Sequence, residues 1–166
     1  ESFCSCLAVD ATDGLVRTMI VGVDQVLLDV VVDVDDDLGI FDRYKVQQNT
    51  QCLAEARHAP LIKHLLDRAE AGEVKTTPGG VIANSLRGGA WWLKKHSPNP
   101  APDIKMIGMV GLDAAATRLR QELKNAGVEP MLDDPPRDAT PNPADERSLS
   151  TGVCCCLIAS KERTMI

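Results

Sequence analysis

Aromatic side chains are scarce in this sequence. Its 166 residues include two Phe, one Tyr and two Trp, so we expect a core of Val, Leu, Ile, Ala and Met side chains. Proteins that bind single-stranded nucleic acid usually stack the bases on aromatic rings. The formal net charge of −6 also repels phosphate backbones. We therefore expect no nucleic-acid partner.

Long hydrophobic runs are also missing. Every apolar stretch is far shorter than the roughly 20 residues that a membrane-spanning helix needs, and no basic and apolar signal segment opens the chain. We expect a soluble protein without membrane insertion, cytoplasmic or in another reducing compartment, and the sequence leaves organelle import open. Residue 1 is Glu and not Met, which indicates a processed chain or part of a longer one.

The cysteine pattern does not favour disulfides or metal binding. Six cysteines are present without a C-x-x-C pair; Cys4 and Cys6 are too close for easy bridging, and Cys154, Cys155 and Cys156 are consecutive. We expect the cysteines to be buried and to act as small hydrophobic residues. His58 and His64 are six residues apart and share no helical face, so we expect both at the surface, without a metal.

Strand-like and helix-like segments alternate along the chain. This order predicts an α/β protein with a largely parallel sheet of about three strands, helices on its faces and an exposed sheet edge that another element should cover. The expected segments are two strands within 18–34, a short helix after the acidic run 33–37, a helix within 47–72 that ends at Gly72, a strand from 104, a helix at 114–128 that Gly127 ends, an irregular loop at 130–150 and a β-hairpin at 151–166.

A Gly pair precedes a third helix, which we expect to begin near Ala83. Bare backbone at a helix start lets a polar ligand approach the unpaired N–H groups. Ile82 and Leu86 begin an apolar stripe that continues through Gly89 and Leu93. Asn84 either faces such a ligand or, with Ser85, caps the helix. We expect the Trp pair at 91–92 to pack in the core.

Five short motifs occur in a characteristic order: V-L-L-D at 26–29, N-T-Q-C-L-A-E at 49–55, G-G-V-I-A-N-S at 79–85, I-G-M-V-G-L-D at 107–113, and T-G-V-C with K-E-R-T at 151–164. Together they resemble the adenosine kinase branch of the ribokinase-like carbohydrate and nucleoside kinases, from about Val21 to Ile166. The resemblance implies a Rossmann-type α/β sheet with helices on both faces and a small β-lid, incomplete because the C-terminal half of the family is absent.

The resemblance also implies domain boundaries and residue roles. Residues 1–17 would be an N-terminal extension, and 18–166 the N-terminal part of the kinase domain, with lid segments at about 24–55 and 150–166. The implied substrate-binding residues are Asp29, Gly79, Gly80 and Asn84 at the ribose, Leu27 and Cys154 at the base, Gln25 at the base or ribose, and Gln51 and Leu53 in the lid. Arg163 would neutralise the transferring phosphate.

Two departures from the family pattern concern the nucleoside pocket, and a third concerns catalysis. Gln25 and Val26 replace the usual Asn-Pro, and Val81 follows Gly80 where a small polar residue is common. The Gly-Ala-Gly-Asp loop, which supplies the catalytic base and the anion hole, is absent, as is the ATP pocket. Asp113 opens a different helix in the family pattern. ATP and Mg²⁺ are implied by the family, but their sites are not in this chain, and we expect the chain to be inactive alone.

Three functions follow. The first is that of an adenosine kinase in purine salvage, which transfers the γ-phosphate of ATP to the 5′-hydroxyl of adenosine or a similar nucleoside; this chain would carry its nucleoside-binding half. The second is a non-catalytic, kinase-derived structural subunit, whose exposed sheet edge meets the missing half or a protein partner. The third is a related sugar kinase.

Overall fold

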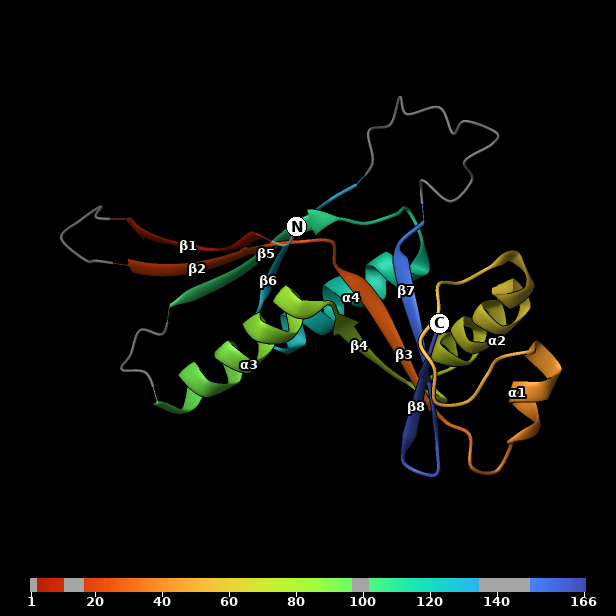
Figure 1. Cartoon of the computed structure of the whole chain (residues 1–166). Helices are drawn as coiled ribbons and strands as arrows, with labels where there is room; N and C mark the ends of the chain where they lie inside the picture. Colours follow the sequence, from red (N-terminus) through yellow and green to blue (C-terminus); the bar gives the residue numbers. More distant parts are fainter. Residues whose placement is uncertain (1–2, 11–16, 97–101, 135–149) are drawn as a thin grey trace. The chain divides into compact units, whose positions relative to one another are not determined.

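The chain divides into two compact units. The computed structural model describes residues 3–10, 17–96, 102–134 and 150–166 (Figure 1). Unit 1 comprises Glu1–Leu27 and Pro78–Gly152, and unit 2 comprises Leu28–Thr77 and Val153–Ile166.

Unit 1 contains a four-stranded sheet in the order β1-β2-β5-β6 (Figure 1). β1 is antiparallel to β2, whereas β2, β5 and β6 are parallel to one another. The parallel part agrees with the expected α/β class. The strands are β1 (Phe3–Asp10), β2 (Arg17–Val23), β5 (Asp103–Met109) and β6 (Glu129–Asp133).

Two helices of unit 1 pack against this sheet: α3 (Val81–His96) and α4 (Ala114–Asn125). Ile82 and Leu86 on α3 are buried, as the apolar stripe predicts, although the helix begins two residues before the expected start. A Cβ atom added to Gly22 on β2 would lie 2.8 Å from the Leu86 Cδ1 atom. The absence of a side chain at this residue therefore lets α3 approach the strand closely.

The two faces of this sheet differ in burial. Ile104 and Met106 alternate with half-buried neighbours and are only 7% and 0% exposed. On the opposite face, Val23 is 47% exposed and Met131 is also 47% exposed. The strand registers place Val23 and Met131 on either side of Ile107, in one row across three strands. Within the described part of the chain, this second face is the more open one.

Unit 2 is built around a second four-stranded sheet, in the order β4-β3-β7-β8 (Figure 1). β7 and β8 form the expected hairpin, with Ser160 and Lys161 at positive φ values of 50° and 69°, as a tight two-residue turn requires. The strands are β3 (Leu27–Asp33), β4 (Lys75–Gly79), β7 (Gly152–Ala159) and β8 (Glu162–Met165); the helices are α1 (Gly39–Tyr44), the 3-10 helix η1 (Ala56–His58) and α2 (Ala59–Glu70).

The helix expected within 47–72 is shorter than predicted. Only α2 and the η1 turn before it are helical, and Gly72 follows α2 with a φ of 76°, which confirms the predicted end. The chain before η1 is held instead by β8: the Met165 N–H donates to the Thr50 carbonyl at 2.9 Å, and the Cys52 N–H donates to the Met165 carbonyl at 3.0 Å. This long-range pairing overrides the local helical pattern.

The expectation that both histidines lie at the surface is wrong for His58, which is 1% exposed. Its Nδ1 atom accepts a hydrogen bond from the Glu55 N–H at 3.0 Å, and its Nε2 atom lies 3.2 Å from the Arg57 side-chain nitrogen. A neutral imidazole has one acceptor nitrogen, and the Glu55 N–H satisfies it, which lowers the cost of burying the ring. His64 is exposed, as expected.

Three further expectations need correction. The strand β1 adds a fourth strand to a sheet for which about three were expected. β6 occupies the start of the segment expected to be an irregular loop; residues 135–149 of that segment lie outside the described residues. Trp91 and Trp92 are 59% and 53% exposed instead of packed in the core. The Lys95 Nζ atom lies 4.1 Å from the Trp91 ring centroid, and Trp92 stacks on His96.

None of the helices in the described ranges has the length and apolar character needed to cross a lipid bilayer.

Candidate functional site

The Gly79-Gly80 pair lies where β4 ends and α3 begins. Gly80 has a φ of 95°, a region that side chains other than glycine rarely adopt, and a Cβ atom there would lie 3.3 Å from the Gln25 carbonyl oxygen. The Gly80 carbonyl accepts the Asn84 N–H at 3.1 Å, so Gly80 is the N-cap residue of α3. Both the conformation and the space at this position require glycine.

Asn84 lies in the first turns of α3 with an exposed side chain. Its Oδ1 atom accepts a hydrogen bond from Arg87 Nη1 at 3.0 Å, and the same Nη1 donates to the Pro78 carbonyl at 2.9 Å. The Ser85 hydroxyl donates to the Val81 carbonyl at 2.9 Å. Because Gly80 occupies the cap position, the alternative that Asn84 and Ser85 cap the helix is wrong.

Arg87 contacts the candidate site residue Asn84, although no sequence motif singles it out. Its guanidinium joins the end of β4 to Asn84 and so orients the Asn84 amide. The sequence signal that could have found Arg87 is its position three residues after Asn84, because residues three apart on a helix are neighbours on its surface. That spacing does not reveal the second bond, to the Pro78 carbonyl.

Gln25 and Leu27 complete the part of the predicted site that unit 1 carries. The Gln25 side chain is exposed, its N–H donates to Asp24 Oδ1 at 2.8 Å, and its carbonyl oxygen faces Gly80. Leu27 is half-buried, and its Cβ atom lies 3.2 Å from where a Cβ on Gly152 would be. Unit 1 therefore brings Gln25 and Gly80 together through their backbones.

Unit 2 carries Asp29, Cys154 and Arg163 on neighbouring strands of its sheet. Asp29 and Cys154 are half-buried, whereas Arg163 is exposed. The hydrogen bond between the Cys154 and Cys156 thiols raises the pKa of Cys154, as do burial and the negative charge of Asp29. The same bond lowers the pKa of Cys156, with help from the positive charge of Arg163. Asp29 and Arg163 therefore act electrostatically on one thiol pair.

The predicted lid residues lie beside β8 in unit 2. Gln51 forms an isolated parallel bridge with Met165, and Leu53 is 91% exposed. The Asn49 N–H donates to the buried Thr164 hydroxyl at 2.8 Å, which fixes the start of this segment. A single apolar side chain in solvent, such as Leu53, is normal at a protein surface.

The predicted site residues thus divide between the units. Within unit 1 lie Gln25, Leu27, Gly79, Gly80 and Asn84, and within unit 2 lie Asp29, Gln51, Leu53, Cys154 and Arg163.

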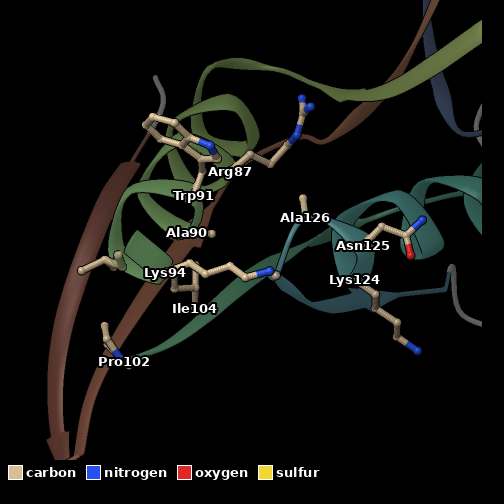
Figure 2. A pocket seen from close by; sticks show the side chains of 11 residues that line it. Arg87, Ala90, Trp91, Lys94, Pro102, Ile104, Lys124, Asn125 and Ala126 are labelled. Atoms are coloured by element: carbon tan, nitrogen blue, oxygen red, sulfur yellow. The ribbon is translucent and has the colours of Figure 1, made fainter. Parts of the chain in front are cut away.

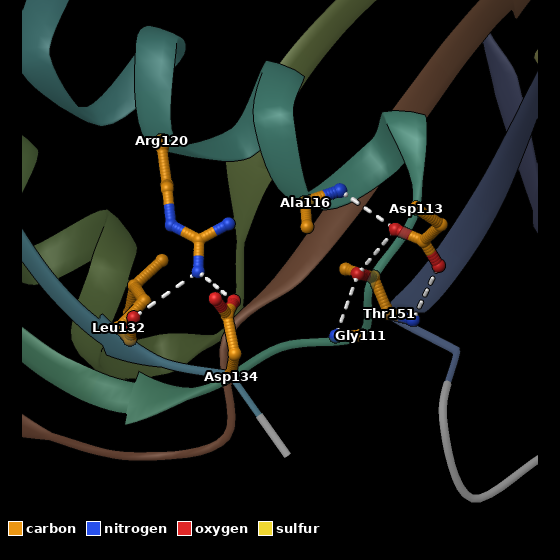
Figure 3. A network of polar contacts seen from close by, with 7 residues as sticks. All are labelled: Gly111, Asp113, Ala116, Arg120, Leu132, Asp134 and Thr151. Carbon is orange, nitrogen blue, oxygen red and sulfur yellow. Dashed lines mark hydrogen bonds and ion pairs between the residues drawn. The ribbon is translucent and has the colours of Figure 1, made fainter. Parts of the chain in front are cut away.

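A network around Asp113 is a second feature that the sequence does not reveal (Figure 3). Asp113 is the N-cap residue of α4: its Oδ1 atom accepts from the Ala116 N–H at 2.8 Å and from the Thr151 hydroxyl at 2.6 Å. Its Oδ2 atom accepts the Thr151 N–H at 2.7 Å, and the Thr151 hydroxyl accepts the Gly111 N–H at 3.0 Å. This network fixes Thr151, the residue before Gly152. The expected helix start at Asp113 is confirmed.

The charge state of Asp113 follows from the same contacts. Burial acts to raise the pKa of the Asp113 carboxyl, but the hydrogen bonds from Thr151 and Ala116, with the positive charge of Arg120, outweigh it. The pKa of Asp113 is therefore lowered. Arg120 in turn donates to the Leu132 carbonyl at 3.1 Å and pairs with Asp134 (Figure 3).

A pocket of about 630 Å³ in unit 1 is separate from the predicted site residues. It lies between α3, the start of β5 and the end of α4, and Figure 2 shows the Trp91 ring at its rim. Arg87 lines the pocket and also bonds to Asn84, and in Figure 2 its guanidinium points away from the Lys94 and Ile104 side chains. We assign no ligand to this pocket.

In the parts of the chain that the structure describes, no three His, Cys, Asp or Glu side chains gather as a metal site requires.

No protein-family model matches the chain. It is 31% identical over 140 residues to the adenosine kinase of Dictyostelium discoideum, an alignment that covers 84% of this chain and 35% of the relative. It is 25% identical over 148 residues to adenosine kinase 1 of Arabidopsis thaliana, covering 89% of this chain and 37% of that protein.

Solved structures agree with these relatives. The crystal structure of Anopheles gambiae adenosine kinase in complex with P1,P4-di(adenosine-5) tetraphosphate matches with a TM-score of 0.60 and 29% identity, covering 87% of this chain and 37% of that one. The apo adenosine kinase of Trypanosoma brucei brucei matches in fold with a TM-score of 0.67 at 20% identity, covering 87% and 38%.

The chain therefore spans little more than a third of the length of the relatives it matches. The resemblance expected from the five motifs is confirmed over this part: the chain is homologous to the adenosine kinases and has a partial ribokinase-like α/β fold.

Proposed function

We propose that this chain supplies the nucleoside-binding half of an adenosine kinase. The observation that carries the proposal is the start of α3. Gly80, at a φ of 95°, presents backbone without a side chain, and the exposed Asn84 follows one turn later. A ribose has two adjacent hydroxyl groups, which need close polar partners, and this segment offers them. The similarity to adenosine kinases over 84% of the chain supports the same assignment.

The proposed roles follow the chemistry of each residue. Asp29 accepts hydrogen bonds from the two ribose hydroxyls, since one carboxylate accepts two donors at once, and Asn84 adds amide contacts while Arg87 holds its Oδ1 atom. The remaining proposed contacts are Gly79 and Gly80 at the ribose, Leu27 and Cys154 at the base, Gln25 at the base or ribose, Gln51 and Leu53 in a lid, and Arg163 at the transferring phosphate.

The phosphoryl transfer itself is proposed for the whole kinase. Adenosine kinase chemistry uses ATP and Mg²⁺, which would supply the γ-phosphate and neutralise its charge. The described residues offer no cluster of three carboxylate, thiol or imidazole groups that fits a metal ion. We therefore derive no step through either cofactor, and we expect the 166-residue chain alone to bind nucleoside without turning over ATP.

The test measures adenosine binding to the 166-residue chain by isothermal titration calorimetry. We expect Asn84→Ala or Asp29→Asn to weaken binding about tenfold, the effect of losing roughly 1.4 kcal/mol of hydrogen bonding. Ser85→Ala is the matched control, because the neighbouring hydroxyl bonds only to its own helix in this structure. Binding of 2′,3′-dideoxyadenosine as tightly as adenosine would contradict the ribose assignment. Preference for ribose or fructose would favour a sugar kinase.

A second function, that of a non-catalytic subunit in a larger assembly, is favoured by one observation. One face of the unit 1 sheet is apolar and open to solvent. Its residues Val23, Met109 and Met131 are between 47% and 65% exposed. Exposed apolar patches of this kind often mark protein interfaces. Copurification with one protein at fixed stoichiometry, without adenosine binding, would support this function over the kinase.

A further inference from the structure

Two of the three consecutive cysteines lie on the same face of β7. Side chains two residues apart on a strand point the same way, and the Cys154 and Cys156 Sγ atoms are 3.9 Å apart. Cys155 lies between them, points to the opposite face and is 0% exposed. The face of the thiol pair also carries half-buried Asp29 on β3 and exposed Arg163 on β8. This is the more open side of the sheet, where Cys154 is half-buried and Cys156 is only 7% exposed.

The distance between the two sulfur atoms indicates what they can bind. A disulfide needs the sulfurs at about 2.05 Å, and strand geometry separates the Cα atoms of alternate residues by roughly 6.6 Å, near the upper limit for such a bond. Two thiolates bound to one atom, each at about 2.3 Å from it, are instead roughly 3.3–3.8 Å apart, the range for bond angles between about 90° at a pyramidal centre and 109° at a tetrahedral one. A single thiophilic atom therefore bridges Cys154 and Cys156 with little movement of the strand.

The surroundings of the pair indicate which thiophilic atom fits. A protein zinc site needs three or four protein ligands, and within the described ranges no group of three such side chains is present. An organic arsenic(III) group needs only two thiolates, because a carbon substituent fills its third position. The lowered pKa of Cys156 supports attack by this sulfur, since the thiolate is the nucleophile.

We propose that Cys154 and Cys156 form a dithiol capture site for trivalent organoarsenicals. In the reaction with an arsine oxide, the As=O bond breaks and two S–As bonds form. The two thiol protons leave with the oxygen as water, and arsenic remains trivalent, so no oxidant or reductant is required. The site shares Cys154 with the proposed nucleoside contacts, but the capture reaction itself needs no nucleoside.

The experiment treats the full chain with phenylarsine oxide and measures its intact mass. Cys4, Cys6 and Cys52 are first replaced by Ser, so that only residues 154–156 carry thiols. We expect one phenylarsenic group per chain, resistant to excess 2-mercaptoethanol and released by 2,3-dimercaptopropanol, because only a dithiol competes with a two-point attachment. Failure to form this adduct, or its release by the monothiol, would overturn the proposal.

Single substitutions in the same background locate the site. Cys154→Ser and Cys156→Ser should each abolish the resistant adduct, whereas Cys155→Ala should keep it, because Cys155 points to the other face. A resistant adduct in either serine variant would show that the pair is wrongly assigned. Circular dichroism checks folding; if a serine variant unfolds, the monothiol and dithiol competition on the background chain decides.

Cadmium provides the alternative outcome. Titration with Cd²⁺ alone reports thiolate binding through charge-transfer absorption in the ultraviolet. Saturable Cd²⁺ binding without any arsenical adduct would replace the proposal with a metal site.

Discussion

The two units hold their predicted site residues by different physical means. In unit 1 the backbone determines the arrangement: Gly80 at positive φ faces the Gln25 carbonyl, and Asp113 ties Thr151 through the backbone and side chain. In unit 2 the alternation of side chains along each strand determines the arrangement. On β7, Cys155 and Leu157 are buried, whereas Cys154 and Ile158 face the more open side. Unit 1 should therefore respond most to added Cβ atoms and lost hydrogen bonds, and unit 2 to lost core volume.

The largest expected effect tests the alternation in unit 2. Leu157→Ala removes a side chain that is 0% exposed and should lower the free energy of unfolding by about 2–5 kcal/mol. Ile158→Ala, one residue along and half-buried, should cost about 1 kcal/mol, because part of its surface is already in water. Urea unfolding followed by circular dichroism measures both. Equal losses would break the assignment of faces on β7.

The next effect tests the hydrogen-bond network of unit 1. Asp113→Ala leaves the Ala116 and Thr151 N–H groups and the Thr151 hydroxyl without this acceptor, and should cost about 1–3 kcal/mol of unfolding free energy. Thr117→Ala, on the same turn and exposed, is the matched control and should change the urea midpoint little. A loss no larger than that of the control would show that the network does not stabilise unit 1.

The pH dependence of the same carboxyl has a definite sign. Because the folded-state pKa of Asp113 is lowered, its stabilisation is complete above the unfolded value of about 3.9 and is lost as the pH falls through the folded value. The stability difference between the wild type and Asp113→Asn should therefore shrink below about pH 4. Urea midpoints of both proteins between pH 7 and pH 3 measure it; a difference that grows on acidification would reverse the assigned shift.

The smallest expected effects come from replacing two glycines at α3, Gly80 before the helix and Gly88 within it. Gly80→Ala should destabilise by about 1–2 kcal/mol, since alanine resists a φ of 95° and its Cβ would approach the Gln25 carbonyl. Gly88→Ala, inside α3 with no atom within 4 Å of the added Cβ, should stabilise by about 0.5–1 kcal/mol. Opposite shifts of the urea midpoint are expected. The same sign for both would remove the special role of Gly80.

Local patterns predicted those parts of the fold whose cause is local. The helix ends at Gly72 and Gly127 follow from glycine's freedom at positive φ, and the hairpin at 151–166 follows from an apolar strand that is joined to a short second strand by a polar turn. His58 was misassigned because its partners, Glu55 and Arg57, meet it only in the folded η1 turn. β6 was missed because Pro130 and the acids around it resemble a loop, yet parallel pairing with β5 makes them a strand.

The sequence by itself determined the homology to adenosine kinases, the α/β class and the residue types of the candidate site, because motif order and hydrophobic periodicity are written along the chain. Only the tertiary structure decided that Arg87 holds Asn84, that Thr151 closes on Asp113 and that the thiols of Cys154 and Cys156 lie 3.9 Å apart. These contacts depend on side-chain directions and on the pairing of distant segments, which are settled when the core packs.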